Sequence, residues 1–186
     1  MKPLVRVVPI FLFLIFAVST PAFSQKTYAL GFGGGVAIPV GKLGDTQKSG
    51  YNALAVLAIG VADLPLGLRF DGIYNNILRT DLTYPAGSSQ VNANLRVTGA
   101  VANLVYAFPA TNAKPYIIAG VGVYTTKRDT TNAKSQNSVG YNAGVGATFG
   151  FGPLAAFIES RYHSLSRSAA KGGVLQFVPI TLGVMF

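Results

Sequence analysis

The chain has 186 residues and a formal net charge of +9, with 50% hydrophobic residues, only 11% charged residues and no cysteine. About a quarter of the residues of ordinary soluble domains are charged, so this composition argues against a water-soluble globular protein, and the lack of cysteine excludes disulfides as its support. A basic chain can bind nucleic acid, but the export signal and the strands described below make an anionic membrane surface the expected partner, with no nucleic acid.

The first 24 residues have the layout of a secretory signal peptide. Lys2 and Arg6 precede an apolar stretch from Val7 to Val18, and small residues continue to Ser24. A charged start, an apolar centre and a small-residue cleavage site are typical of a segment removed after export. We therefore predict a signal peptide over residues 1–24, export through the general secretory pathway and one mature domain over residues 25–186. The alternative is an uncleaved membrane anchor.

Alternation with a period of two residues dominates the rest of the chain and predicts β-strands with two different faces. Segment 139–151 shows it best, because Val139, Tyr141 and Val145 share one face while Asn142 lies on the other. Most such segments reach the roughly 9–11 residues that a tilted strand needs to cross a bilayer. The eight predicted strands are residues 27–40, 51–62, 66–78, 91–108, 115–126, 139–151, 153–165 and 174–186.

The predicted connections alternate between long and short. Long polar segments follow the first, third, fifth and seventh strands, whereas short turns with proline follow the second, fourth and sixth. This asymmetry is typical of transmembrane barrels, which have short periplasmic turns and longer external loops. We therefore predict an all-β fold, an eight-stranded antiparallel up-and-down transmembrane β-barrel. The long segments are 41–50, 79–90, 127–138 and 166–173, and the short ones are 62–65, 109–115 and 152–153.

The aromatic residues gather near both ends of the predicted strands. Two such belts are expected where a barrel meets the two membrane–water interfaces. A soluble β-sandwich has no reason to sort its aromatic residues in this way. The long-loop belt comprises Tyr51, Tyr74, Tyr124, Tyr141 and Tyr162, and the short-turn belt comprises Tyr28, Tyr106, Phe108, Tyr116, Phe149, Phe151 and Phe186.

A few charged residues lie within the predicted strands, and we expect them to face the barrel interior. An Arg or Lys facing lipid at the midplane costs about 2–4 kcal/mol. We expect Arg69 and Arg161 to pair with Asp71 and Glu159. Because eight strands leave room only for side chains, we interpret the cluster as a structural network, with a gate or proton path as the alternative. The predicted interior polar cluster is Arg69, Asp71, Arg96, Glu159, Arg161 and His163.

No pattern in the sequence predicts a cofactor, a metal ion or a catalytic group. Val36 stands where a dinucleotide-binding loop that begins at Gly31 would need its last glycine. A single histidine, no cysteine and scattered acids make no set of metal ligands. His163 is followed directly by Ser164, and neighbouring residues of a strand point to opposite faces, so no nucleophile with its base is expected there.

The predicted external loops are rich in basic residues. Charge-assisted hydrogen bonds to phosphate favour Arg and Lys. We therefore predict that these loops contact lipopolysaccharide phosphates or another anionic surface, the alternative being solvated loops with incidental charge. The basic residues are Lys42, Lys48, Arg79, Lys127, Arg128, Lys134, Arg167 and Lys171.

The end of the chain carries a pattern that resembles the signal read by the outer-membrane barrel assembly machinery: apolar residues at alternate positions before a final phenylalanine. Segments 103–106, 115–122, 140–144 and 159–163 also resemble the small outer-membrane β-barrel domain family, which includes OmpA-like and OmpX-like barrels. The resemblance implies a location in the outer membrane, contact with its lipid, and passage with periplasmic chaperones. The residues of the C-terminal pattern are Val178, Ile180, Leu182, Val184 and Phe186.

The resemblance also implies a structural or surface-interaction role, in envelope integrity, adhesion or defence, without catalysis. The alternatives are a small outer-membrane lipid-modifying enzyme or a narrow channel and, further off, a soluble periplasmic barrel that carries a lipid. The lipid A deacylases use a His-x-Ser arrangement, but Leu165 stands two places after His163. The sequence leaves the oligomeric state open.

Overall fold

A computed structural model describes residues 28–60, 64–79, 93–110, 113–130, 133–167 and 173–186. The predicted signal peptide over residues 1–24 lies outside these described residues. Within the described ranges, no helix combines the length and the apolar character needed to cross a membrane.

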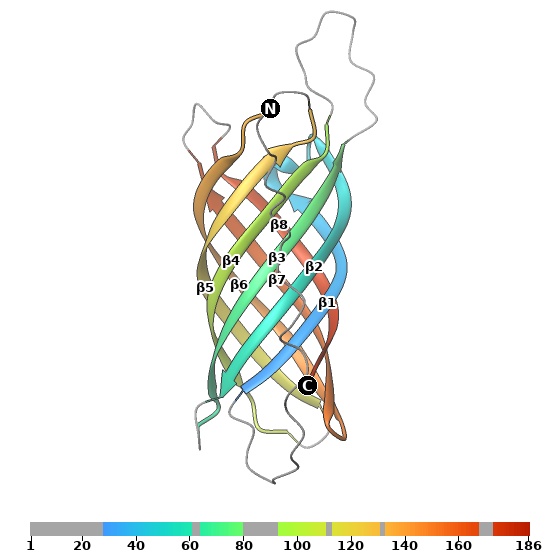
Figure 1. Ribbon diagram of the computed structural model, residues 1–186, viewed down its shortest axis with the longest axis vertical. Helices are drawn as coiled ribbons and strands as arrows, with labels where there is room; N and C mark the ends of the chain where they lie inside the picture. The colour runs from blue at the N-terminus through green and yellow to red at the C-terminus, as the bar shows by residue number, and fades with distance from the viewer. Residues whose placement is uncertain (1–27, 61–63, 80–92, 111–112, 131–132, 168–172) are drawn as a thin grey trace, which may run out of the picture.

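The described chain folds into eight antiparallel strands that close into one barrel (Figure 1). Each strand pairs with its neighbours in the sequence, and the last strand pairs with the first, so the predicted architecture is confirmed. A short 3-10 helix, η1, follows the first strand at Gly41–Leu43. The strands are β1 (Tyr28–Val40), β2 (Gln47–Gly60), β3 (Leu66–Arg79), β4 (Leu95–Ala107), β5 (Ala113–Arg128), β6 (Gln136–Phe151), β7 (Leu154–Ser166) and β8 (Leu175–Met185).

The barrel closes where β1 meets β8. Their pairing runs from Gly31 opposite Met185 to Val40 opposite Gln176. A side-chain carbon at Gly35 would overlap the carbonyl oxygen of Ile180, so the close approach of the two backbones requires glycine there. The closed sheet leaves no strand edge exposed to lipid, where unpaired backbone groups would be costly.

Several strands are longer than predicted, and most of the added length lies on the side of the long connections, although β5 also begins at Ala113 instead of 115. β2 begins at Gln47 instead of 51, and β6 begins at Gln136 instead of 139. β5 extends to Arg128, and Thr126 still pairs with Gln136. Polar residues in these extensions masked the strands in the sequence, because backbone pairing continues beyond the part that requires an apolar face.

Alternate residues face outward and inward as the period of two predicts. On β6, Val139, Tyr141 and Val145 are all exposed on the outer face. Two members of the predicted aromatic belts were placed wrongly, because Tyr116 and Tyr124 are buried inside the barrel. Their places on β5 alternate with exposed residues such as Val121 and Val123, and that parity requires them to face inward.

The barrel interior is filled by side chains. At its long-loop end lies an apolar cluster, which Leu43 of η1 also joins. The sequence predicted only a polar cluster inside the barrel, so this apolar cluster was not predicted. The apolar cluster is made of Ala37, Leu43, Leu54, Val56, Ile73, Ile77, Leu95, Val97, Val101, Tyr124, Phe157, Leu165, Leu175 and Phe177, of which Phe157 lies toward the short turns.

Candidate functional site

Four charged side chains form a closed ring of ion pairs inside the barrel, which we call the charged ring: Arg69, Asp71, Glu159 and Arg161. Arg69 donates from Nε to Asp71 Oδ1 at 2.8 Å and from Nη1 to Glu159 Oε2 at 2.7 Å. Arg161 donates from Nη1 to Asp71 Oδ2 at 2.7 Å, and its Nε lies 2.7 Å from Glu159 Oε1. Each cation thus contacts both anions, and the ring carries no net charge.

The charged ring comes from two strands only, on opposite sides of the barrel. Arg69 and Asp71 are two residues apart on β3, and Glu159 and Arg161 are two residues apart on β7. Side chains two apart on a strand share a face, so each strand supplies one acid and one base to the interior. All four side chains are at most 4% exposed. The predicted pairing of these four residues agrees with this geometry.

Neutral groups complete the hydrogen bonding of the charged ring. The Tyr116 hydroxyl donates to Glu159 Oε2 at 2.8 Å, and Asn103 Nδ2 donates to Asp71 Oδ2 at 2.9 Å. Asn142 Nδ2 in turn donates to Asn103 Oδ1 at 2.9 Å. The Arg69 guanidinium lies 5.4 Å from the centre of the Phe157 ring, on the short-turn side. Buried carboxylates and guanidinium groups are tolerated only with such complete pairing.

His163 links the charged part of the interior to the apolar cluster. Its ring stacks on Phe177 with centroids 4.9 Å apart, and its Nδ1 lies 3.1 Å from the Tyr124 hydroxyl. The structure therefore places His163 inside the barrel as predicted, but on the apolar side of the charged ring. Ser164 belongs to the opposite face of β7, because it is the next residue along the strand. The described residues contain no group of three or more His, Cys, Asp or Glu side chains that could hold a metal ion.

Arg96 is not part of the interior polar cluster, so the prediction that placed it there was wrong. Its Nη2 lies 3.1 Å from Asp129 Oδ1, and both side chains are partly exposed. Arg96 shares a face of β4 with Thr98 and Ala100, whereas Asn103, an odd number of residues away, faces inward. The parity of positions along β4 separates Arg96 from the interior, and Asn103 occupies the place opposite Arg69.

Sequence reasoning missed the neutral members of the interior network. Tyr116, Asn103 and Asn142 all alternate with exposed apolar residues on their strands, such as Ile117, Leu104 and Tyr141. That alternation was visible in the sequence and would have placed all three inside. Polar type alone did not identify them, because asparagine also favours turns and tyrosine also favours membrane interfaces.

The seven described members of the predicted basic set gather at the long-loop end of the barrel, although four of them belong to strands and not to loops. Lys48 is in β2, Arg79 ends β3, and Lys127 and Arg128 end β5. Lys42 lies in η1, Lys134 and Arg167 lie in connections, and Lys171 falls outside the described residues. Partial burial and the positive charge of Arg128 both lower the pKa of Arg167, so these two cations repel each other.

The family model described as outer membrane protein beta-barrel domain matches residues 10–186. No curated protein matches the chain.

Three solved structures illustrate the likeness in fold. The surface protein A of Neisseria (NspA) has a TM-score of 0.63 and 17% identity, over 86% of this chain and 96% of that one. A major outer membrane protein from Thermus thermophilus has a TM-score of 0.52 and 14% identity, over 86% and 97%. The N-terminal β-barrel domain of Pseudomonas aeruginosa OprF has a TM-score of 0.52 and 14% identity, over 86% and 96%.

Proposed function

The chain belongs to the outer membrane protein beta-barrel domain family, and from this we propose that it is a closed, non-catalytic barrel of the outer membrane whose basic outer end contacts lipopolysaccharide phosphates. The observation that carries the proposal is the division of charge along the barrel. Inside, the charged ring is neutral and buried, while the cations at the long-loop end are mostly exposed. The role is therefore one of the surface and not of the interior.

The filled interior supports the absence of conduction. The charged ring joins β3 to β7 across the barrel, and the apolar cluster with Leu43 fills the space on the long-loop side of that ring. An eight-stranded barrel has an interior just wide enough for side chains. Ions would have to displace both layers to pass.

The basic end supports contact with phosphate. Long loops of outer-membrane barrels face the outside, and phosphate groups of lipopolysaccharide lie in that leaflet. Lys127, Arg128 and Lys134 are exposed there, close together along the chain around the β5–β6 connection. Cations that repel each other, such as Arg128 and Arg167, gain from an anion placed between them. Phosphates shared between barrel and lipid would strengthen the envelope.

The closed interior is tested by conductance in planar lipid bilayers. We expect no conductance steps from the purified barrel, and regular steps would contradict the closed interior. The control is a porin reconstituted in the same bilayer.

Contact with lipopolysaccharide is tested by neutralising three cations together, in the variant Lys127→Gln, Arg128→Gln, Lys134→Gln. We expect it to bind vesicles containing lipopolysaccharide several-fold more weakly than the unchanged protein. Lys114→Gln is the matched control, because Lys114 is exposed at the opposite end of β5. Equal binding by all three proteins would overturn this part of the proposal.

A further inference from the structure

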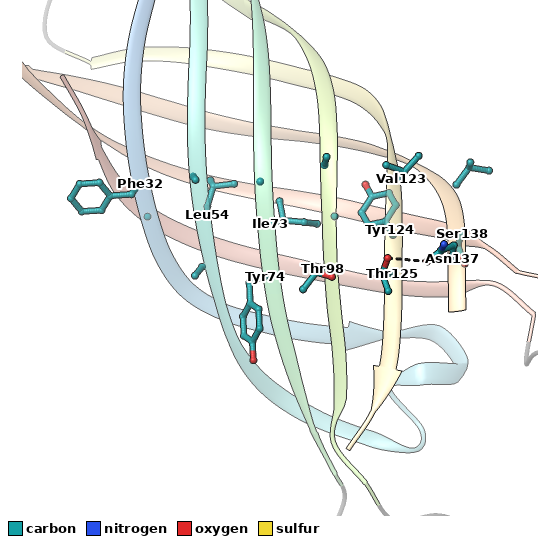
Figure 2. A pocket seen from close by; sticks show the side chains of 17 residues that line it. Phe32, Leu54, Ile73, Tyr74, Thr98, Val123, Tyr124, Thr125, Asn137 and Ser138 are labelled. Atoms are coloured by element: carbon teal, nitrogen blue, oxygen red, sulfur yellow. Dashed lines mark hydrogen bonds between the residues drawn. The ribbon is translucent and has the colours of Figure 1, made fainter. Parts of the chain in front are cut away.

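The outer, lipid-facing surface of the barrel has a hollow over β2, β3 and β4. Figure 2 shows its lining side chains, which run from Phe32 on β1 at one side to Asn137 and Ser138 on β6 at the other. Three small residues form its floor in one row across the sheet: Ala55 pairs with Gly72, and Gly72 pairs with Ala100. The lining is mostly apolar, so in the membrane this hollow is a groove for hydrocarbon.

The fold itself does not require the glycine at the centre of this hollow. A side-chain carbon at Gly72 would meet only the Cβ of Ala55, at an ordinary contact distance of 3.9 Å. The positive-φ glycines among the described residues are Gly41, Gly152 and Gly173, so Gly72 has an ordinary backbone conformation. It therefore differs from Gly35 at the closing seam, and its small size keeps space open on the outside of the barrel.

Two cations lie on the same outer face, toward the long-loop end. Arg96 on β4 pairs directly with Lys127 on β5. Arg96 is four residues from Ala100 on the same face, which is about 13 Å along the strand. A lipid has the same arrangement, because its charged head group lies at the interface and its acyl chains lie below it, as the cations and the hollow do here.

Between the cations and the hollow lies a polar band. Tyr51 and Tyr74 stack with centroids 6.1 Å apart, and Asn76 Nδ2 donates to the Tyr51 hydroxyl at 3.0 Å. Tyr74 pairs with Thr98, a lining residue of the hollow. These hydroxyl groups lie where a sugar or ester of a lipid head group would need hydrogen bonds.

Arg96 retains donor capacity for such a head group. Its Nη2 contacts Asp129, but the side chain is 43% exposed, so the outer part of the guanidinium group stays accessible from the membrane interface. Asp129 is partly exposed, and an exposed ion pair of this kind is weak enough for a phosphate to compete with it. Arg96 and Lys127 carry two positive charges and Asp129 carries one negative charge, so these three side chains have a net charge of +1.

We propose that this face binds one molecule of lipid A, the phosphorylated and acylated anchor of lipopolysaccharide, with a phosphate at Arg96 and Lys127 and an acyl chain in the hollow. The proposal rests on the proposed function and assigns it a specific site. A second copy of the barrel fits less well, because an isologous contact through this face would set the cations of both copies at the same depth, where they repel.

The phosphate half of the site is tested by the variant Arg96→Gln, Lys127→Gln, with binding of purified lipid A measured by native mass spectrometry in detergent. We expect its affinity for lipid A to fall about tenfold or more, since charge-assisted contacts are lost. Lipid A stripped of its phosphates should bind the variant and the unchanged protein alike. The comparison variant is Lys114→Gln, which removes an exposed cation at the short-turn end of β5 and should lose at most about twofold.

The hydrocarbon half is tested by Gly72→Leu, which fills the hollow from the outside. We expect it to weaken binding of both forms of lipid A. Ala143→Leu is the matched control, because Ala143 is exposed on the outer face of β6 and does not line this hollow. The shift in gel mobility between heated and unheated samples verifies that each variant has formed the barrel.

The outcomes separate this site from the broader proposal. If the Arg96 and Lys127 variant binds lipid A as well as the comparison variant, the site is overturned while lipopolysaccharide contact stands. If Gly72→Leu binds like Ala143→Leu, the acyl groove is overturned. If the unchanged protein prefers lipid A no more than phosphatidylglycerol, both the site and the proposed function fail.

Discussion

The two halves of the barrel interior are occupied by side chains of opposite character, charged in one half and apolar in the other. On β3, Arg69 and Asp71 belong to the charged ring, while Ile73 and Ile77, on the same face, belong to the apolar cluster. On β7, Glu159 and Arg161 are followed on the same face by Leu165. The side chains of both halves are buried. The interior can therefore be built either from paired charges or from packed apolar side chains, and it does not have to be polar.

The two halves should respond differently to a single substitution. A buried ion pair is often no more stable than apolar residues of the same volume, but removal of one partner leaves a buried charge unpaired. An apolar cluster loses only the contacts and volume of the atoms removed. We therefore expect substitutions in the charged ring to destabilise the barrel more than substitutions in the apolar cluster or at the surface.

Glu159→Ala should be the most destabilising of these changes. It leaves Arg69 and Arg161 with Asp71 as their one remaining acid in the charged ring. We expect the free energy of unfolding to fall by about 3–5 kcal/mol, measured from urea unfolding in lipid vesicles. A loss under about 1 kcal/mol would show that the ring is not a closed unit.

Leu175→Ala should cost about 3 kcal/mol in the same assay, because Leu175 is buried in the apolar cluster. Leu182→Ala on the lipid-facing side of β8 serves as control, since Leu182 is exposed. Equal losses at the two positions would mean that the cluster is loosely packed.

His163→Phe tests the junction between the two halves. The new ring keeps the stacking on Phe177 but removes the Nδ1 that lies 3.1 Å from the Tyr124 hydroxyl, which should cost about 1–2 kcal/mol. Adding Tyr124→Phe should recover part of this loss, because the hydroxyl that lost this contact is then removed. A double variant less stable than His163→Phe would argue against the hydrogen bond.

Arg96→Gln should have the smallest effect on stability, below about 1 kcal/mol, because its ion pair with Asp129 is partly exposed. Arg69→Gln is the informative comparison, since the same change inside the charged ring should cost several times more. Similar losses at the two arginines would remove the distinction between interior and surface charge.

The lipid-facing side of this barrel was predictable, and the interior was only partly so. Lipid admits apolar side chains almost exclusively, so exposed residues such as Val121, Val145 and Leu182 repeat every second position and reveal the strands. The interior admits either charges or hydrocarbon, and period alone does not say which. The ion pairs of the charged ring could be predicted from the signs of the charges. The inward position of Tyr116 and the outward position of Arg96 could be predicted only from their odd or even place along the strand, which was not used.

The surface site had no counterpart in the sequence. Ala55, Gly72 and Ala100 lie on three different strands, and their alignment depends on the register between β2, β3 and β4. A shift of one residue in either pairing would turn one of them inward. The register depends on the lengths of the connections, which the sequence predicted only approximately. The alignment of these three residues could therefore be seen only in the structure.

The pairing of β1 with β8 has a consequence for how the barrel forms. It joins the two ends of the folded chain, so it is the contact most distant in sequence, and contacts of this kind slow folding. Until it forms, two strand edges remain unpaired, and hydrocarbon penalises both. A partly closed barrel is therefore not a resting state, and assembly should be an all-or-none event whose rate is limited by the arrival of the last strand.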